Sequence, residues 1–383
     1  MVLVFVPKET ELGETRVAAV PETVKPLVAS GVQVEIESSA GLCAGFTDAQ
    51  YVAVGAKIVT DSLASFGRAD VVLKIRAPHE AGQELEGLKS GVILISSLQP
   101  MLRLDLVRAL AERKVTSFAL DLVPRITRAQ KMDILSSQAT SAGYQAVLIA
   151  AMLLPRFFPM MMTAAGTITP ARVFVLGAGV AGLQAIASAR RLGGIVEAND
   201  VRPMVKEQVE SLGAKFVDTG APPEAQGQGG YAKETGDEYR RKQQEILTAH
   251  IAQADVVITT ASIPGKRAPL IVSDAMLQGM KQGSIVVDLA AENGGNVEGI
   301  VKGERIVRHG VTLVGDVNLP GQKPYDSSRM FSRNVLGFLE LFLKKGQLAT
   351  DFQDEILVAA MVTHLGEIRH KGAADAVSAK GAS

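Results

Sequence analysis

Residues 172–182 read Arg172-Val-Phe-Val-Leu-Gly-Ala-Gly-Val-Ala-Gly182. A short apolar run leads directly into glycines with the spacing G-x-G-x-x-G. Helical apolar spacing follows from Leu183 to Leu192, and a second apolar run, Ile195 to Ala198, leads to Asp200. This order predicts a strand, a tight turn, a helix and a second strand that ends at an acid, which is the arrangement of a dinucleotide-binding unit.

The three glycines have different expected roles. Gly177 permits the tight turn, Gly179 lets backbone N–H groups approach a pyrophosphate, and Gly182 allows the helix to pack closely on the strand. The pyrophosphate would lie at the positive N-terminal end of the helix. The alternative is a glycine-rich turn that only packs a helix against a strand.

Asp200 bears on which dinucleotide would bind. A carboxylate at the end of the second strand accepts hydrogen bonds from a ribose 2′-OH and repels a 2′-phosphate. Arg202, two residues further on, offers a partner for a phosphate, so the pattern alone leaves both dinucleotides open. Because Asp200 stands at the strand end itself, we favour NAD(H) over NADP(H).

The composition narrows the class of protein. A chain of 383 residues predicts two domains, and 47% hydrophobic residues with 4% aromatic residues suit a well-buried α/β protein. Forty basic residues balance forty acidic ones, so no net charge attracts nucleic acid or anionic lipid. The single cysteine, Cys43, excludes an internal disulfide framework and suits a reducing compartment.

Short β-branched runs alternate with helical patterns, which predicts two doubly wound parallel-sheet domains, Rossmann-like, with a deep cleft between them. We expect residues 1–133 and 321–383 to form a discontinuous N-terminal α/β domain and residues 134–320 to form the nucleotide-binding domain. The apolar region 147–165 is interrupted by prolines, so it lacks the ~20 apolar residues that a membrane span requires. The small, polar residues 373–383 are expected to fray.

One segment, from Gly220 to Gln244, breaks the alternation with prolines and glycines. A long loop inside a compact α/β domain is usually a functional lid or a disordered insert. Tyr231 follows Gly230, where an aromatic side chain is unexpected unless it docks, so we favour a mobile lid over residues 220–240.

The second unusual stretch is Pro124-Arg-Ile-Thr-Arg-Ala-Gln-Lys-Met-Asp-Ile-Leu-Ser-Ser-Gln138. It follows a strand and leads into a long apolar helix over residues 133–154. Its polar side chains would stand at the domain cleft, where ligand sites are common. Alternatively, Asp133 and Ser136 cap the helix and the arginines are solvated. The spacing alone does not separate these two interpretations.

This polar stretch resembles the signature loop of the NAD(H)-binding component of proton-translocating nicotinamide nucleotide transhydrogenase, within the alanine dehydrogenase/transhydrogenase family. The likeness covers nearly the whole chain. Other segments that carry it include Pro159-Met-Met-Met-Thr-Ala-Ala-Gly-Thr167, Gly229-Gly-Tyr-Ala-Lys-Glu234, Thr259-Thr-Ala-Ser-Ile-Pro-Gly-Lys266 and Asp288-Leu-Ala-Ala-Glu-Asn-Gly-Gly295.

The resemblance implies direct hydride transfer from NADH to NADP⁺ bound on a partner subunit, coupled to proton movement through an integral-membrane subunit. It also implies a homodimer on the cytoplasmic side, peripheral to the inner or plasma membrane through its partners. The expected cofactor-binding residues are Arg125, Ile126, Arg128, Gln130, Asp133, Ser136, Gly177, Ala178, Gly179, Val180, Gly182, Asp200, Val201, Arg202, Gly230, Tyr231, Gln243 and Ser262.

Within that set the residues expected to position the nicotinamide are Arg125, Gln130, Asp133 and Ser136. Direct transfer between two nicotinamides breaks one C–H bond and forms another, so it requires positioning and exclusion of water but no general acid or base. No histidine falls in a motif loop, and no metal site is predicted.

The alternative within the same superfamily is an alanine dehydrogenase. Arg16 and Lys74 stand where its substrate-carboxylate residues are expected. Its catalytic histidine is expected near Ser97-Leu-Gln99, where this chain has none, and Glu292 replaces its catalytic aspartate. Imine chemistry requires a proton shuttle, which this chain lacks.

A third hypothesis is a non-catalytic NADH-sensing subunit. The polar loop argues against it, because a sensor has no reason to expose one face of the nicotinamide.

Overall fold

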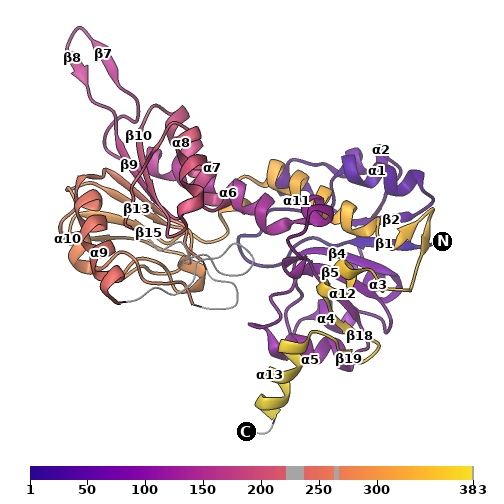
Figure 1. Ribbon diagram of the computed structural model, residues 1–383. Helices are drawn as coiled ribbons and strands as arrows, with labels where there is room; N and C mark the ends of the chain where they lie inside the picture. The colour runs from indigo at the N-terminus through magenta and orange to yellow at the C-terminus, as the bar shows by residue number, and fades with distance from the viewer. Residues whose placement is uncertain (221–236, 263–266, 382–383) are drawn as a thin grey trace. The chain divides into compact units, whose positions relative to one another are not determined.

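The computed structural model describes residues 1–220, 237–262 and 267–381 (Figure 1). The chain divides into two compact units, Met1–Gln138 with Gly321–Ser383, and Ala139–Pro320. The division falls inside one helix, α6 (Ile134–Leu153), which begins where the sequence places the domain boundary. Both units are built on largely parallel sheets, so the expected α/β class with Rossmann-like sheets is confirmed.

The first unit contains an eight-stranded sheet in the order β19-β18-β6-β5-β4-β1-β2-β3. The strands β1 to β6 pair in parallel, whereas the two strands from the C-terminal tail add to one edge in antiparallel fashion. The strand bounds are β1 Leu3–Val6, β2 Gln33–Glu37, β3 Lys57–Val59, β4 Val71–Arg76, β5 Ile93–Ser97, β6 Thr116–Ala119, β18 Met361–His364 and β19 Glu367–Ile368.

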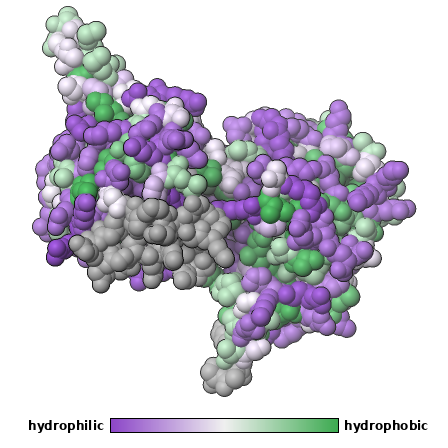
Figure 2. Space-filling model, in the orientation of Figure 1, coloured by the Kyte–Doolittle hydropathy of each residue, from purple (hydrophilic) through white to green (hydrophobic). Residues whose placement is uncertain are grey.

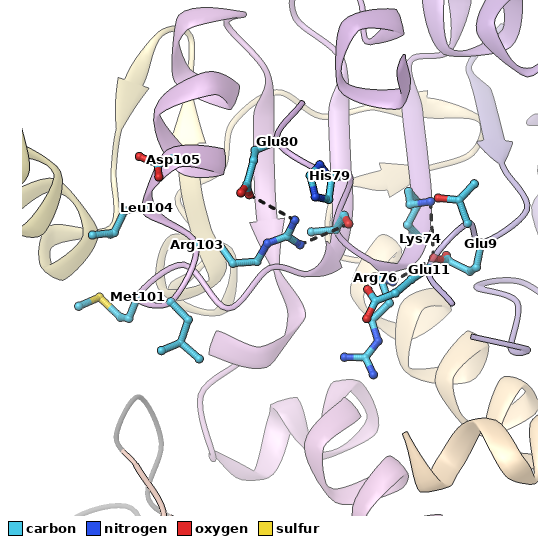
Figure 3. Close-up of a pocket in the computed structure, with 13 residues that line it drawn as sticks. Glu9, Glu11, Lys74, Arg76, His79, Glu80, Met101, Arg103, Leu104 and Asp105 are labelled. Carbon is cyan, nitrogen blue, oxygen red and sulfur yellow. Dashed lines mark hydrogen bonds and ion pairs between the residues drawn. The ribbon is translucent and has the colours of Figure 1, made fainter. Parts of the chain in front are cut away.

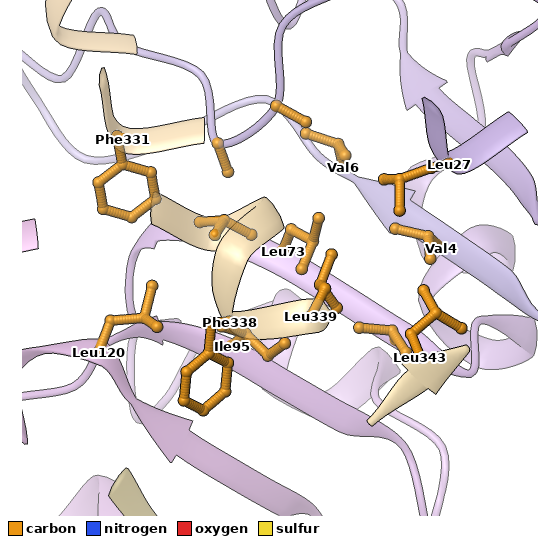
Figure 4. Packing of buried hydrophobic residues seen from close by; sticks show 14 of the residues in the cluster. Val4, Val6, Leu27, Leu73, Ile95, Leu120, Phe331, Phe338, Leu339 and Leu343 are labelled. Carbon is orange, nitrogen blue, oxygen red and sulfur yellow. The ribbon is translucent and has the colours of Figure 1, made fainter. Parts of the chain in front are cut away.

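Helices cover both faces of this sheet, because its strands are apolar on both sides. Val4 and Val6 face one cluster, which includes Phe338 and Leu339 (Figure 4), and Phe5 faces the other, where it packs edge-on against Phe66. The helices on the first face are α1 (Pro21–Ala29), α2 (Asp48–Ala53), α11 (Pro324–Leu339) and α12 (Glu355–Ala360). Those on the second are α3 (Ser62–Arg68), α4 (Gln83–Gly87), α5 (Leu104–Glu112) and α13 (Lys371–Gly381).

The helix α13 corrects one expectation. The composition of residues 373–383 predicts a frayed end, yet the structure continues a helix as far as Gly381. Ala373 is fully buried and belongs to the same cluster as Leu106 and Leu110 of α5, so packing against another element holds the segment in place.

The second unit contains a seven-stranded sheet in the order β11-β10-β9-β12-β13-β15-β14, in which only β14 runs antiparallel. From the central strand β9 the chain builds outward to β11 and then returns to β12 on the other side. Ligands of such sheets bind outside the carboxyl ends of the strands at this reversal. The strand bounds are β9 Arg172–Leu176, β10 Ile195–Asn199, β11 Lys215–Phe216, β12 Val256–Thr259, β13 Ile285–Asp288, β14 Arg305–Arg308 and β15 Val311–Val314.

Helices again lie on both faces. Apolar residues of α6, α7 (Val180–Arg191) and α8 (Lys206–Ser211) share one cluster with the sheet. Those of α9 (Asp237–Gln253) and α10 (Asp274–Gln278) share the other. In the described ranges, no helix combines the length and apolarity needed to cross a membrane.

A β-hairpin that the sequence does not predict projects from the second unit (Figure 1). Its strands are β7 (Met161–Thr163) and β8 (Gly166–Ile168), and every residue of both is exposed. Apolar side chains are prominent there, since Met160 and Met162 are 59% and 77% exposed. The hairpin carries pale green residues in the hydropathy view (Figure 2).

Candidate functional site

The glycine turn between β9 and α7 has the geometry that its sequence predicts. Gly177 has a φ of +99°, which L side chains rarely adopt. A Cβ on Gly182 would lie 1.9 Å from the carbonyl oxygen of Gly177, so the fold itself requires glycine there. A Cβ on Gly179, by contrast, would meet no heavy atom within 4 Å among the described residues.

The space over Gly179 fits an anionic group. Gly179 is the N-cap of α7 and provides no side chain to satisfy the first backbone N–H groups of the helix. Those groups and the helix dipole attract negative charge, so a pyrophosphate fits the open space at this end. Val180, the first helical residue, is exposed beside it, whereas Ala178 is buried beneath.

Asp200 ties the second strand to the glycine turn. Its Oδ2 accepts a hydrogen bond from the backbone N–H of Ala178 at 2.7 Å. The guanidinium of Arg202 donates to both carboxylate oxygens, at 2.9 Å from Nε and 2.8 Å from Nη2. The charge of Arg202 is therefore balanced within the protein, which weakens the alternative that it serves a 2′-phosphate. Val201 lies half-buried between these two residues.

Two further loops meet the same edge of the sheet. Thr260 follows β12, and its hydroxyl donates to the carbonyl of Gly177 at 3.0 Å. The side-chain amide of Asn296 donates to the carbonyls of Ala261 and Pro269, at 2.9 and 2.8 Å, and so holds both sides of the segment that contains Ser262. Ser262 itself is exposed.

Asp288, at the end of β13, fixes the loop that leads to Asn296. It is completely buried, and burial raises the pKa of its carboxyl above the ordinary value. It accepts hydrogen bonds from the backbone N–H groups of Ala290 and Asn296, at 2.9 and 2.7 Å. The sequence analysis did not identify Thr260, Asn296 or Asp288; the only local signal was a polar residue at each strand end.

The long loop is only partly described. Gly230 and Tyr231 lie outside the described residues. Gln243 lies on α9 and is half-buried.

The polar stretch of the first unit forms a short 3₁₀ helix, η3 (Thr127–Met132), followed by α6. Asp133 caps α6, because its Oδ1 accepts from the backbone N–H of Ser136 at 2.9 Å and its Oδ2 from the Ser136 hydroxyl at 2.6 Å. The side chains of Arg125 and Gln130 are exposed, and Ile126 is half-buried. The cap therefore joins two of the four expected positioning residues into one rigid group.

Arg128 has a different setting. Its guanidinium donates to both oxygens of Asp354, at 2.7 and 3.0 Å, and to Glu355 at 3.0 Å. These pairs join η3 to α12 and orient the guanidinium toward protein carboxylates.

A pocket of about 540 Å³ lies in the first unit, formed by the loops that follow β1, β4 and β5 (Figure 3). Lys74 at its base is 1% exposed, and its Nζ lies 2.8 Å from Glu84 and 3.5 Å from Glu9. Burial opposes the charge on Lys74, but the two carboxylates outweigh it and raise its pKa.

Arg16 is paired in the same way. Its Nε and Nη2 donate to the two carboxylate oxygens of Glu14, at 2.7 and 2.6 Å. Both cations expected to hold a substrate carboxylate in an alanine dehydrogenase are thus already neutralised by carboxylates of this chain. Gln99, at the end of the stretch where the histidine is expected, has a φ of +48°.

The structure thus brings the glycine turn, Asp200, Arg202 and Ser262 to one sheet edge of the second unit. The polar stretch with Gln130, Asp133 and Ser136 belongs to the first unit, apart from α6, which enters the second.

Family comparisons agree with this division. The model of the alanine dehydrogenase/PNT N-terminal domain matches residues 5–142, and that of the C-terminal domain matches residues 146–371. The chain belongs to the alanine dehydrogenase/PNT family.

Particular relatives separate the two branches of the family. The chain is 46% identical to the first of the proteins that make up NAD(P) transhydrogenase subunit alpha in Rhodospirillum rubrum, over 96% of this chain and 97% of that protein. A crystal structure of transhydrogenase from Sinorhizobium meliloti is similar with a TM-score of 0.84 and 44% identity, over 96% of this chain and 98% of that one. Alanine dehydrogenase of Staphylococcus saprophyticus is 28% identical, over 98% and 97%. The chain is thus nearer to these transhydrogenases than to that alanine dehydrogenase.

Proposed function

We propose that this chain is the NAD(H)-binding component of a proton-translocating NAD(P) transhydrogenase. It passes a hydride directly between its own nicotinamide and that of NADP(H) held on a partner subunit. The observation that carries this choice over an alanine dehydrogenase is the internal pairing of Arg16 and Lys74 with carboxylates. A substrate carboxylate would have to displace those buried pairs, which is costly.

The second unit provides the nucleotide contacts in this proposal. The N–H groups at the start of α7 hold the pyrophosphate over Gly179, and Asp200 accepts from the adenosine ribose, with Val201 and Arg202 beside it. The resemblance adds Gln243, Ser262 and the segment of Gly230 and Tyr231 as further contacts.

The first unit orients the reacting ring. When bound, the dinucleotide supplies the hydride from its nicotinamide. Gln130 and Arg125 orient the carboxamide and ribose, and the Asp133–Ser136 cap presents a fixed hydroxyl. None of these groups has to exchange a proton with the ring, so their contribution is geometry and exclusion of water. We assign Arg128 to anchoring the loop on α12, because its guanidinium already binds two carboxylates.

The partners follow from the same proposal. The NADP(H)-binding and integral-membrane subunits bind this component at the cytoplasmic side of the membrane. The exposed apolar hairpin β7–β8 is the contact of a homodimer, since an apolar ribbon without a core of its own is stabilised by burial against another surface.

The test is to mix the purified chain with the NADP(H)-binding subunit of a transhydrogenase, NADH and NADP⁺. The expected result is reduction of NADP⁺ that depends on both proteins. In a parallel reaction with NADH, pyruvate and ammonia, no alanine forms. Alanine formation would establish the dehydrogenase alternative, and NADH binding without any hydride exchange would establish a sensor.

A further inference from the structure

We propose that Arg16 and Gln138 are positioning residues for hydride transfer. Together with Asn334 they hold the first turn of α6 and the end of η3 from both sides, and so fix the Asp133–Ser136 cap. This inference rests on the proposed function, because the cap matters only if that function requires an oriented nicotinamide.

The first step is a buried and rigid anchor. The side chains of Glu14 and Arg16 are 1% and 5% exposed, and they form a bidentate pair. Arg76 donates to the same Glu14 carboxylate at 3.2 Å. The flanking residues are fastened to α11 as well, since the Thr15 hydroxyl donates to the carbonyl of Gly321 and the backbone N–H of Val17 to the hydroxyl of Ser328.

The second step carries this anchor to α6. The remaining guanidinium nitrogen of Arg16, Nη1, donates to Oε1 of Gln138 at 2.7 Å. The amide nitrogen of Gln138 donates to the hydroxyl of Ser137 at 3.2 Å and to the carbonyl of Ser327 at 3.1 Å. Gln138 is therefore used as acceptor and donor at once, which fixes its rotamer.

The third step closes the frame around the cap. The hydroxyl of Ser137 donates to Oδ1 of Asn334 at 2.7 Å, and Nδ2 of Asn334 donates to the carbonyl of Lys131 at 2.8 Å. Helix α11 also packs tightly here, because a Cβ on Gly337 would lie 3.3 Å from the side chain of Lys131. The cap thus lies between two braced points, Lys131 before it and Ser137 after it.

A frame of this kind has a use in hydride transfer. A displacement of about 1 Å in a positioning group can cost about 100-fold in rate, even when binding is little affected. The cation that an alanine dehydrogenase would direct at its substrate is here directed at Gln138, which turns a binding group into a brace.

The test begins with Gln138→Leu, which keeps the side-chain volume and removes both hydrogen-bonding atoms. In the nucleotide-free protein, we expect faster hydrogen exchange of the backbone amides of residues 133–138. With the partner subunit, we expect hydride transfer to slow about ten-fold while the Kd for NADH changes less than about two-fold. Arg16→Lys keeps a cation beside Glu14 but cannot also reach Gln138, so it should act in the same direction if Gln138→Leu fails to fold.

The matched control is Ser117→Ala. It removes a buried hydrogen bond of the same unit, between Ser117 and Thr363 at 2.7 Å, away from the polar loop. We expect it to lower the melting temperature without changing the rate of transfer. The double variant Arg16→Lys/Gln138→Leu should be no slower than the slower single variant, because both break one chain of contacts.

Two results would overturn the proposal. One is a Gln138→Leu protein of reduced stability whose transfer rate and amide exchange at residues 133–138 match the wild type. The other is a loss of NADH affinity equal to the loss of rate. Absence of transfer in the wild type would instead refute the proposed function, and the exchange experiment would still test the brace.

Discussion

At the scale of single residues, Gln130 offers an uncharged amide on an exposed position of η3. Gln130→Asn keeps the amide but withdraws it by one methylene. We expect hydride transfer to slow about ten-fold or more while NADH binds nearly as before, because transfer depends on alignment more steeply than binding does. Single-turnover rates and fluorescence titration of NADH measure the two quantities; equal losses in both would show that Gln130 only binds.

Glu14 makes a prediction about pH. Burial by itself raises its pKa, but Arg16 and Arg76 outweigh burial and lower the pKa below its ordinary value. The charged form then stabilises the fold fully above the unfolded-state pKa of about 4.3, and that stabilisation is lost as the pH falls through the lower folded-state value.

Urea unfolding of the wild type and of Glu14→Gln measures this contribution. We expect the difference in unfolding free energy to be constant between about pH 7 and pH 5 and to shrink in stronger acid. A difference that persists undiminished at about pH 2 would show that ionisation of Glu14 contributes nothing.

At the scale of elements, two glycines of the same turn should respond in opposite ways. Gly182→Ala places a methyl group 1.9 Å from the carbonyl oxygen of Gly177, so we expect a loss of about 3 kcal/mol in stability. Gly179→Ala meets no atom within 4 Å and has an ordinary backbone conformation, so the fold should be nearly as stable.

The two variants differ in the second measurement. Gly179→Ala should weaken NADH binding about ten-fold or more, because its methyl group occupies the space that the pyrophosphate needs. Thermal unfolding and NADH titration of both proteins check the pair. Unchanged NADH affinity in Gly179→Ala would argue that the turn only packs a helix on a strand.

The elements that the sequence predicts best are those whose signals are local. The strand, glycine turn and helix of residues 172–192 are predicted correctly, and the long helix expected over residues 133–154 is α6, Ile134–Leu153. The apolar run Ile356–Val362 is recognisable from the sequence only as a returning tail; the structure divides it between α12 and β18. The hairpin β7–β8 leaves no periodic signal, because neither of its faces packs on the core of its own unit.

The contacts of the site are less predictable than its residues. Arg128 pairs with Asp354, 226 positions away, and Arg16 contacts Gln138, 122 positions away. Such pairs join elements through the tertiary fold and leave no spacing in the sequence. The cap of α6 by Asp133 and Ser136 is one of two interpretations that the sequence leaves open, and the structure shows that this cap is formed.

At the scale of the whole molecule, the hairpin should control the oligomeric state. Met161→Asp combined with Met162→Asp places two charges on its apolar surface, and we expect the dimer to dissociate into monomers because those charges would be desolvated at the contact. Sedimentation velocity measures the mass. Val307→Asp, at another exposed valine of the same unit, is the control and should remain dimeric. A wild type that is monomeric, or a double variant that stays dimeric, would contradict this assignment.

Direct transfer between two bound nicotinamides is tested most directly with NADH that carries deuterium at the transferred position of its ring. The chain and its NADP(H)-binding partner subunit are mixed with this NADH and NADP⁺ in ordinary water, and the NADPH is analysed by mass spectrometry. We predict that the NADPH retains the deuterium in full, since no group in the proposed mechanism exchanges a proton with the ring. NADPH that carries solvent hydrogen at the reduced carbon, or no NADPH formed by the two proteins together, would contradict the account.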